Sequence, residues 1–199
     1  MLCAVSAASL SQGIDTVIDR GVYRSFYSRA YKQPVYVVYT LHKGGGKCAR
    51  SGASFKSGGL RGSATNADYA KSGYDKGHLV PFEDFAYDCR LAEQTFRFYN
   101  AVPQAPGLNR GSWSKWEAVV RSVSQRDTLV IVAGGSGYRR KIGGGVYVPD
   151  FCWKVVYSRW LKVVLYALVF ENDGSPAPTR ETITTLETRL GYQVRQHLK

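Results

Sequence analysis

Three polar residues, His78, Asn109 and Glu117, have the chemical types needed for metal-assisted hydrolysis of a phosphate ester. His78 lies in the stretch SGYDKGHLVP, between a glycine and a short apolar run. An imidazole with an ordinary pKa near 6.5 is mostly neutral at pH 7, so it can accept a proton from water. The amide oxygen of Asn109 and the carboxylate of Glu117 are hard ligands that suit Mg²⁺. A base beside a cation is what phosphodiester hydrolysis requires.

The spacing of Asn109 and Glu117 limits how both could serve one metal ion. Eight residues of α-helix advance about 12 Å and turn about 80° beyond two full turns. Two positions inside one regular helix therefore cannot both bind an ion directly. Either Asn109 precedes the helix, as Pro106 and Gly107 suggest, or Glu117 reaches the ion through water. We expect at least the second, with Asn109 as the inner ligand.

Each of these residues also has a common structural explanation. A histidine beside a glycine is more often part of the framework than a base. An asparagine before a helix is usually an N-cap, and a helical glutamate is usually a solvated charge. Trp113 and Trp116 fit a hydrophobic core better than a surface that stacks on bases. Residue types and spacing alone leave a metal nuclease as one hypothesis among several.

The elements that would position these residues follow from hydrophobic periodicity and turn signals. β-Branched and aromatic residues predict strands at 34–41, 77–82, 127–135, 146–157 and 161–170. Apolar residues three and four apart predict helices at 83–98, 110–125 and 179–190, the last with Thr179 as N-cap, Glu181 in the first turn, and Leu186 and Leu190 on one face. Loops are expected at 50–73 and 100–109, a flexible hairpin tip at 42–47 and a basic turn at 138–145. This order predicts an α+β fold with a mixed, largely antiparallel sheet.

Charge is the unusual feature of the composition. The 199 residues include 27 Lys and Arg against 15 Asp and Glu, a net charge of +12. Such an excess favours a polyanionic partner, namely nucleic acid, an anionic membrane surface or an acidic protein. The longest apolar stretch, 160–170, is too short to cross a bilayer, and the first residues make a poor signal peptide. We expect no membrane partner, and the sequence does not specify a compartment.

The four cysteines allow several redox states. Cys3, Cys48, Cys89 and Cys152 show no CxxC spacing, so a structural zinc site is not expected. An even number permits two disulfides with three possible pairings. Free buried thiols are equally consistent with this density.

Two longer motifs resemble the signature of the DNA/RNA non-specific endonucleases, which are ββα-metal (His-Me finger) enzymes. The first is YDKGHLVP, which carries Asp75 to His78 where the family has Asp-Arg-Gly-His. The second is FYNAVPQAPGLNRGSWSKWE, which carries Asn100, Pro103, Gln104, Asn109, Trp113 and Glu117 in the family's order. The similarity extends from about Tyr31 to the tail LETRLGY, so it covers most of the chain.

The resemblance implies a role for each matching residue. His78 would be the general base, Asn109 the inner metal ligand, and Glu117 would position the metal's waters. Asn100 would support the histidine or the substrate phosphate. A loop arginine would stabilise the transition state, with Arg50 as first choice and Arg61 as the alternative.

Lys76 and Arg110 would bind substrate. Lysine at position 76 departs from the family's arginine, so it keeps the charge but loses the bidentate fork. Asp75 is expected to be a hydrogen-bond acceptor rather than a proton carrier.

These observations predict a single nuclease domain, with residues 1–30 as an N-terminal extension and 31–199 as the core. The predicted activity is Mg²⁺-dependent cleavage of DNA and RNA without sugar specificity, with Mn²⁺ able to substitute, by a monomer or homodimer. Two alternatives stay open. One is a nuclease restricted to DNA or to particular structures, and the other is a nucleic-acid-binding module without activity.

Overall fold

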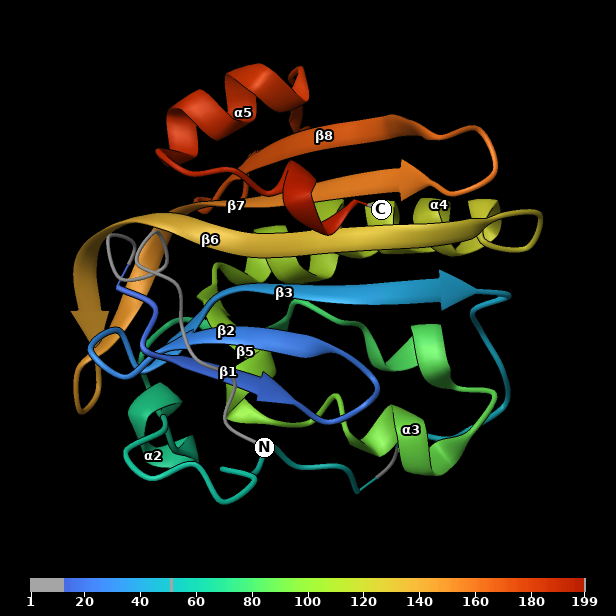
Figure 1. Cartoon of the computed structure of the whole chain (residues 1–199). Helices are drawn as coiled ribbons and strands as arrows, with labels where there is room; N and C mark the ends of the chain where they lie inside the picture. The colour runs from blue at the N-terminus through green and yellow to red at the C-terminus, as the bar shows by residue number, and fades with distance from the viewer. Residues whose placement is uncertain (1–12, 51, 199) are drawn as a thin grey trace.

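A seven-stranded antiparallel sheet forms the centre of the molecule in the computed structural model, which describes residues 13–50 and 52–198 (Figure 1). Its strands lie in the order β1 (Thr16–Asp19), β2 (Arg24–Ser28), β3 (Gln33–His42), β6 (Thr128–Ile142), β7 (Val146–Ser158), β8 (Val163–Glu171) and β9 (Thr179–Arg180). All pairings in this sheet are antiparallel. The predicted α+β class with a largely antiparallel sheet is confirmed.

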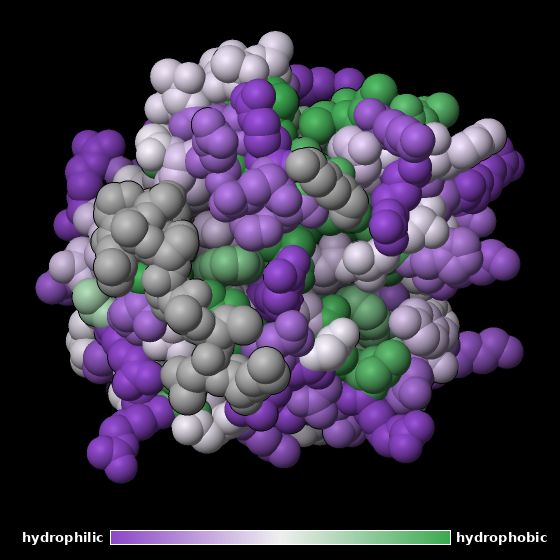
Figure 2. Space-filling model, viewed as in Figure 1, coloured by the Kyte–Doolittle hydropathy of each residue, from purple (hydrophilic) through white to green (hydrophobic). Residues whose placement is uncertain are grey.

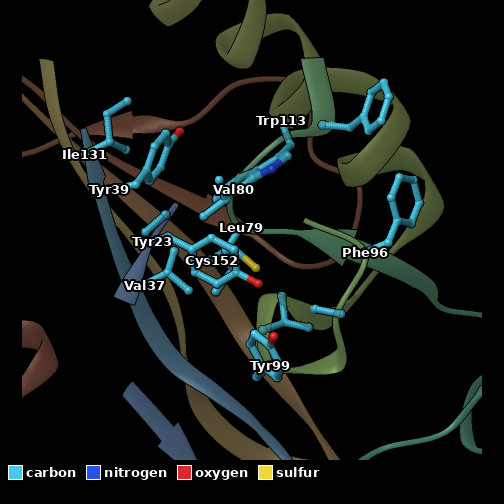
Figure 3. Close-up of a cluster of buried hydrophobic side chains, with 14 of the residues drawn as sticks. Tyr23, Val37, Tyr39, Leu79, Val80, Phe96, Tyr99, Trp113, Ile131 and Cys152 are labelled. Atoms are coloured by element: carbon cyan, nitrogen blue, oxygen red, sulfur yellow. The ribbon is translucent and has the colours of Figure 1, made fainter. Parts of the chain in front are cut away.

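The sheet is buried on both faces because its central strands carry runs of consecutive apolar residues, whose side chains point to the two faces in turn. Leu129 and Ile131 of β6 point into one hydrophobic cluster, and Val130 and Val132 point into the other. This is the period-2 geometry of a strand. The first cluster also contains Leu79, which follows His78 directly (Figure 3). The sheet therefore supports the candidate site from beneath.

One face of the sheet carries a ββα unit. Strands β4 (Asp75–His78) and β5 (Ala101–Gln104) form a separate antiparallel pair. A π-helical turn, η3 (Leu108–Trp113), then leads into helix α4 (Ser114–Val123). The opposite face is covered by helix α5 (Ile183–Leu190) and the C-terminal turn η4 (Arg195–His197) (Figure 1).

The segment 100–109 was predicted to be a loop, but its first part forms strand β5. Proline is rarely found in a central strand, but β5 belongs to a sheet of two strands, in which every strand is an edge. Pro103 lies opposite Lys76. The strand expected at 77–82 is shorter than predicted, because it ends at His78 and the chain then turns.

The helix expected at 83–98 is also wrong as a continuous element. The segment instead contains the 3₁₀ turn η1 (Phe82–Phe85), the short helix α3 (Cys89–Glu93) and the start of the turn η2 (Phe98–Asn100). Asp88 interrupts the pattern because its carboxylate accepts hydrogen bonds from the backbone N–H groups of Arg90 and Leu91. That is the geometry of an N-cap, so a new helix begins there.

The C-terminal helix begins later than expected. Thr182, not Thr179, is its N-cap and accepts a hydrogen bond from Thr185 N. Thr179 lies in strand β9 instead. Leu186 is fully buried on the helix face that meets the sheet, as the pattern predicts, and Leu190 packs against the same cluster.

Residues 13–30 belong to the central sheet, contrary to the predicted boundary at residue 31. Strand β1 pairs with β2, and β2 pairs with β3. Tyr27 of β2 is fully buried in the main core. The first twelve residues of the predicted extension lie outside the described residues.

The glycine-rich segment at 42–47 is not a flexible hairpin tip. Strand β3 pairs only with β2 and β6, so no hairpin follows it. The backbone N–H of Gly44 donates to Ser124 Oγ at 3.0 Å. A Cβ added at Gly46, where φ is +143°, would lie 2.1 Å from the backbone of Ala86. The segment is therefore packed closely against its neighbours, and only glycine fits at position 46.

The cysteines of the described chain form one disulfide, between Cys48 and Cys89. It joins the segment that carries Arg50 to helix α3. Cys152 is a buried free thiol in β7, and Cys3 lies outside the described residues.

Hydrophilic side chains predominate on the face shown in Figure 2, with smaller hydrophobic groups between them. No helix within 13–50 and 52–198 is long and apolar enough to cross a membrane.

Candidate active site

A cleft of about 420 Å³ opens between the end of β4, the turn that follows it, and the η3–α4 helix. Five of the predicted site residues line it together, namely His78, Arg50, Asn109, Arg110 and Glu117. The rest of the lining consists of Pro81, Phe82, Glu83, Ser114 and Arg121. The fold thus brings residues from four separate segments to one hollow.

His78 is held rigidly at the end of β4. Its ring packs against Phe55 and Phe96, with both ring centroids 4.7 Å away. Its carbonyl oxygen accepts a hydrogen bond from Trp113 Nε1 at 3.1 Å, which ties β4 to the π-helical turn. The side chain is only 7% exposed, and its Nε2 has no hydrogen-bond partner in the described protein. Burial, with a contribution from the Arg50 charge, lowers the pKa of His78 to about 3.

A neutral imidazole with an unused ring nitrogen is suited to accept a proton. With a pKa of about 3, the ring remains uncharged at pH 7. The ring lines the cleft, and its buried Nε2 has no hydrogen-bond partner in the described protein, so the imidazole is not committed to a contact that would hold its proton acceptor.

Asn100 acts on the backbone beside His78. Its Nδ2 donates to the carbonyl oxygens of Val80 and Thr95, both at 2.9 Å, and its Oδ1 accepts from Val80 N at 2.9 Å. The residue is fully buried. Both polar atoms of the Asn100 amide are therefore bonded inside the protein, to the segment that follows His78 and to Thr95.

Gly77 is required by the packing of the neighbouring strand. In the structure, a Cβ at Gly77 would lie 1.9 Å from Oε1 of Gln104, which is fully buried on the neighbouring strand β5. The glycine therefore makes room for a protein side chain.

Asp75 accepts hydrogen bonds from two residues that line the cleft, Asn109 and Arg110, in agreement with its predicted role as an acceptor. Its Oδ2 accepts from Asn109 Nδ2 at 2.9 Å. Arg110 binds the same carboxylate through Nε and Nη2, at 2.8 and 2.7 Å. Because the amide nitrogen of Asn109 is taken by Asp75, the amide oxygen is the atom left for other ligands.

Lys76 lies in an adjoining hollow of about 300 Å³ that shares Arg50 and Asn109 with the cleft. Its Nζ donates to Asn66 Oδ1 at 2.7 Å. Arg50 faces both hollows, with its guanidinium 5.4 Å from the centroid of the Phe96 ring and 3.5 Å from Glu83 Oε1. Arg61, the alternative choice, is exposed and lines neither hollow.

Glu117 sits above a buried group of charges. Burial raises the pKa of Glu117 to about 7, and the nearby Lys154 opposes this shift. Lys154 is 1% exposed, with its Nζ 4.3 Å from the centroid of the Trp113 ring. Asp84 is held by Arg121 at 2.5 Å and by Tyr39 Oη at 3.0 Å.

The sequence reading missed Arg121, Asp84 and Lys154. Arg121 could have been found, because it follows Glu117 by four residues and so lies on the same face of α4. Asp84 and Lys154 have no such signal, since they come from a distant turn and strand.

The donor set fits a single hard cation. Asn109 precedes α4 and is separated from it by Gly111, whose backbone angles (φ −106°, ψ −110°) are not helical. This kink lets Asn109 and Glu117 line one cleft, as a position before the helix would require. Within residues 13–50 and 52–198 no three His, Cys, Asp or Glu side chains gather around a metal position. Mg²⁺ does not need such a cage, because it keeps several waters and takes one or two protein oxygens.

Acidification is expected to destabilise the protein through His78. Between pH 6.5 and about 3 the unfolded chain binds a proton that the folded chain does not, so the free energy of unfolding falls as the pH falls. From pH 6.5 to 5 the loss is about 2 kcal/mol. His197, whose pKa burial lowers to about 4, adds an effect of the same sign.

Urea unfolding at several pH values measures this slope. In His78→Ala the slope should be shallower than in the parent protein. Equal slopes in the parent and the His78→Ala protein would contradict the buried, neutral state of this ring.

Comparisons with known proteins give the same assignment as the site geometry. The family model described as DNA/RNA non-specific endonuclease matches residues 4–198. A protein named "Nuclease" from Nostoc sp. is 40% identical over 94 residues, which is 46% of this chain and 34% of that protein. Human "Endonuclease G, mitochondrial" is 36% identical over 87 residues, 43% of this chain and 29% of that protein. The matches thus span about a third of the length of these curated relatives.

The fold is shared with a solved structure. A chain from the crystal structure of the EndoG/EndoGI complex, whose title concerns the mechanism of EndoG inhibition, superposes with a TM-score of 0.81. The alignment covers 98% of this chain and 95% of that one, at 21% sequence identity. Because the family model extends over nearly the whole sequence, the chain belongs to the DNA/RNA non-specific endonuclease family.

Proposed function

We propose that this protein is a Mg²⁺-dependent endonuclease that hydrolyses phosphodiester bonds in both DNA and RNA. The observation that carries the proposal is the convergence of His78, Arg50, Asn109 and Glu117 on one cleft. Membership of the family supports the same activity. The net charge of +12 supports binding to a phosphate backbone, and such contacts carry no sequence information.

In the proposed reaction, the scissile phosphate occupies the cleft and a water molecule lies beside His78. The imidazole of His78 accepts a proton from this water as its oxygen attacks phosphorus; the bond to the leaving sugar oxygen breaks, and that oxygen takes a proton from solvent. Arg50, which extends over the same cleft, stabilises the added negative charge on the phosphate oxygens. Asn100 keeps His78 in place through the adjoining backbone.

Asn109 Oδ1 would hold the ion directly, and Glu117 would orient its waters. When bound, Mg²⁺ or Mn²⁺ would supply positive charge beside the phosphate oxygens. Arg110 is oriented by its two bonds to Asp75 and remains 71% exposed, so it is available to a neighbouring phosphate. Lys76 would contact the substrate as a point charge from the adjoining hollow.

Incubation of purified protein with circular plasmid DNA and with RNA, each in the presence of Mg²⁺, tests this function. Internal cleavage of both substrates is the expected result. Cleavage of DNA alone would favour the DNA-restricted alternative. Tight binding of both nucleic acids without cleavage, whichever divalent ion is added, would favour a nucleic-acid-binding module without activity and contradict the proposal.

Arg50→Ala is expected to lower kcat by roughly 10²-fold, a loss typical of removing one group that stabilises developing charge. Arg61→Ala is the matched control, because it removes an exposed loop arginine outside the cleft, and it should change kcat less than about two-fold. The measurement is steady-state cleavage of a defined duplex. The reverse order of effects would assign the transition-state arginine to position 61.

A further inference from the structure

A basic two-stranded arm extends from the central sheet. Strand β3 pairs with β6 only from Thr128 to Gly134, and β8 pairs with β7 only from Phe151 to Ser158. The far parts of β6 and β7 therefore pair only with each other. We call residues 138–149 the basic arm. Figure 1 shows this ribbon curving away from the sheet towards helix α2 (Asn66–Tyr69).

The basic arm is held in place. Gly144 N at its tip donates to Asp68 Oδ1 at 2.6 Å, and Lys32 Nζ donates to Gly144 O at 2.6 Å. At its base, Tyr31 contacts Tyr138 and Tyr147, with ring centroids 4.4 and 5.1 Å apart. An isolated two-stranded hairpin is barely stable in water. These anchors give the arm one fixed position.

The arm presents three exposed cations, Arg139, Arg140 and Lys141. Arg139 forms an ion pair with Asp150 at 2.6 Å. Arg140 and Lys141 form no ion pair with any residue in 13–50 or 52–198, and each lies over a tyrosine ring instead. Asp68, the acidic residue beneath the tip, is buried and already bonded to Thr65 and Gly144. Both positive charges therefore remain for external anions, one on each face of the ribbon, because Arg140 and Lys141 are consecutive residues of β6.

The arm lies next to the candidate active site. The Arg140 guanidinium is 6.0 Å from the centroid of the Tyr74 ring. Tyr74 directly precedes Asp75, whose carboxylate holds Asn109 and Arg110 at the cleft. Helix α2 makes a second connection, because Asn66 binds Lys76 while Asp68 binds the arm. Allowing for one Cα–Cα step and two side chains, Arg140 lies within roughly 15 Å of Asp75, a distance that about four nucleotides of one strand would cover.

We propose that Arg140 and Lys141 bind backbone phosphates of the nucleic acid a few nucleotides away from the bond being cut. This inference rests on the proposed function for the identity of the ligand. The guanidinium and ammonium groups match phosphate charge, and nothing in the arm's cations selects a base. The arm would increase affinity for long substrates and leave the chemical step unchanged.

Binding of a fluorescent 30-base-pair duplex tests the proposal without requiring cleavage. The parent for this test carries His78→Ala, and the arm variant adds Arg140→Gln and Lys141→Gln. The affinity of each protein for the duplex is measured at several salt concentrations. The slope of log K against log salt should be smaller in magnitude by about 2 for the arm variant than for its parent, because two phosphate contacts are lost. The matched control, Arg159→Gln with Lys162→Gln, removes the same two charges from the β7–β8 turn at the opposite end of β7.

Equal slopes for the arm variant and the control would overturn the proposal, because the effect would then be one of net charge. Loss of folding, checked by thermal unfolding, is not expected, since both arm side chains are exposed. In the active protein, the arm substitutions should raise KM for long DNA and leave cleavage of a dinucleotide unchanged. A wild-type protein that binds through the arm but cuts nothing would contradict the proposed function and leave the arm assignment standing.

Discussion

His78→Ala is expected to lower kcat by roughly 10²- to 10⁴-fold, the usual contribution of a general acid or base. The ring lines the cleft and stays uncharged at pH 7, because burial lowers its pKa to about 3, so it can accept a proton. Nucleic-acid binding should persist, because one neutral side chain contributes little beside 27 Lys and Arg residues. Cleavage and duplex binding measured on the same preparation separate the two effects.

The control for this variant is its stability. The ring fills space between Phe55 and Phe96, so alanine leaves a small cavity and a lower unfolding temperature. A second variant, His78→Asn, fills more of that space and cannot serve as the base. If both variants are folded at the assay temperature and both still cut DNA at nearly the parent rate, His78 is not the general base.

Removal of divalent ions should abolish cleavage, and added Mg²⁺ or Mn²⁺ should restore it. Among the residue changes, Asn109→Ala should weaken metal binding more than Glu117→Gln does. Asn109 has its amide nitrogen fixed by Asp75 and its oxygen left for a ligand, whereas Glu117 is expected to act through water. Titration of each variant with Mn²⁺, followed by paramagnetic resonance or calorimetry, measures affinity independently of activity.

Two results would contradict this assignment. Cleavage that continues unchanged in excess EDTA would remove the metal from the proposed function. A metal-bound structure with Glu117 coordinated directly would reverse the order of the two ligands. Ser114→Ala is a suitable control, because this exposed hydroxyl lines the same cleft and should leave the affinity nearly unchanged.

Much of the site could be predicted from the sequence because its motifs are local. His78 follows Asp75 by three residues within β4, and Trp113, at the end of η3, precedes Glu117 of α4 by four residues. Spacing within a strand or helix is set by backbone geometry, so residue types at these intervals already specify on which face of the element each side chain lies. The alternating residues of β3, β6 and β7 predicted the sheet for the same reason.

The remaining features depend on which distant segments meet. Pro103 lies in a strand only because β4 provides a partner, and Gly77 is required only because Gln104 fills the space beside it. Arg50 lines the cleft and Arg61 does not. The segment that carries Arg50 is fixed near His78 because the Cys48–Cys89 disulfide and the close packing of Gly46 hold the residues just before it.

The buried charges near Glu117 could not be predicted from the sequence for the same reason. Lys154 comes from the middle of β7, Asp84 from the turn after β4, and Arg121 from α4. No interval along the chain links them, and each position alone is consistent with an ordinary strand, turn or helix residue. Residue types and local spacing therefore determined the class of chemistry and the elements that carry it. The tertiary structure decided which side chains surround His78 and which cations remain exposed beside the cleft, because those contacts join residues that only long-range packing brings together.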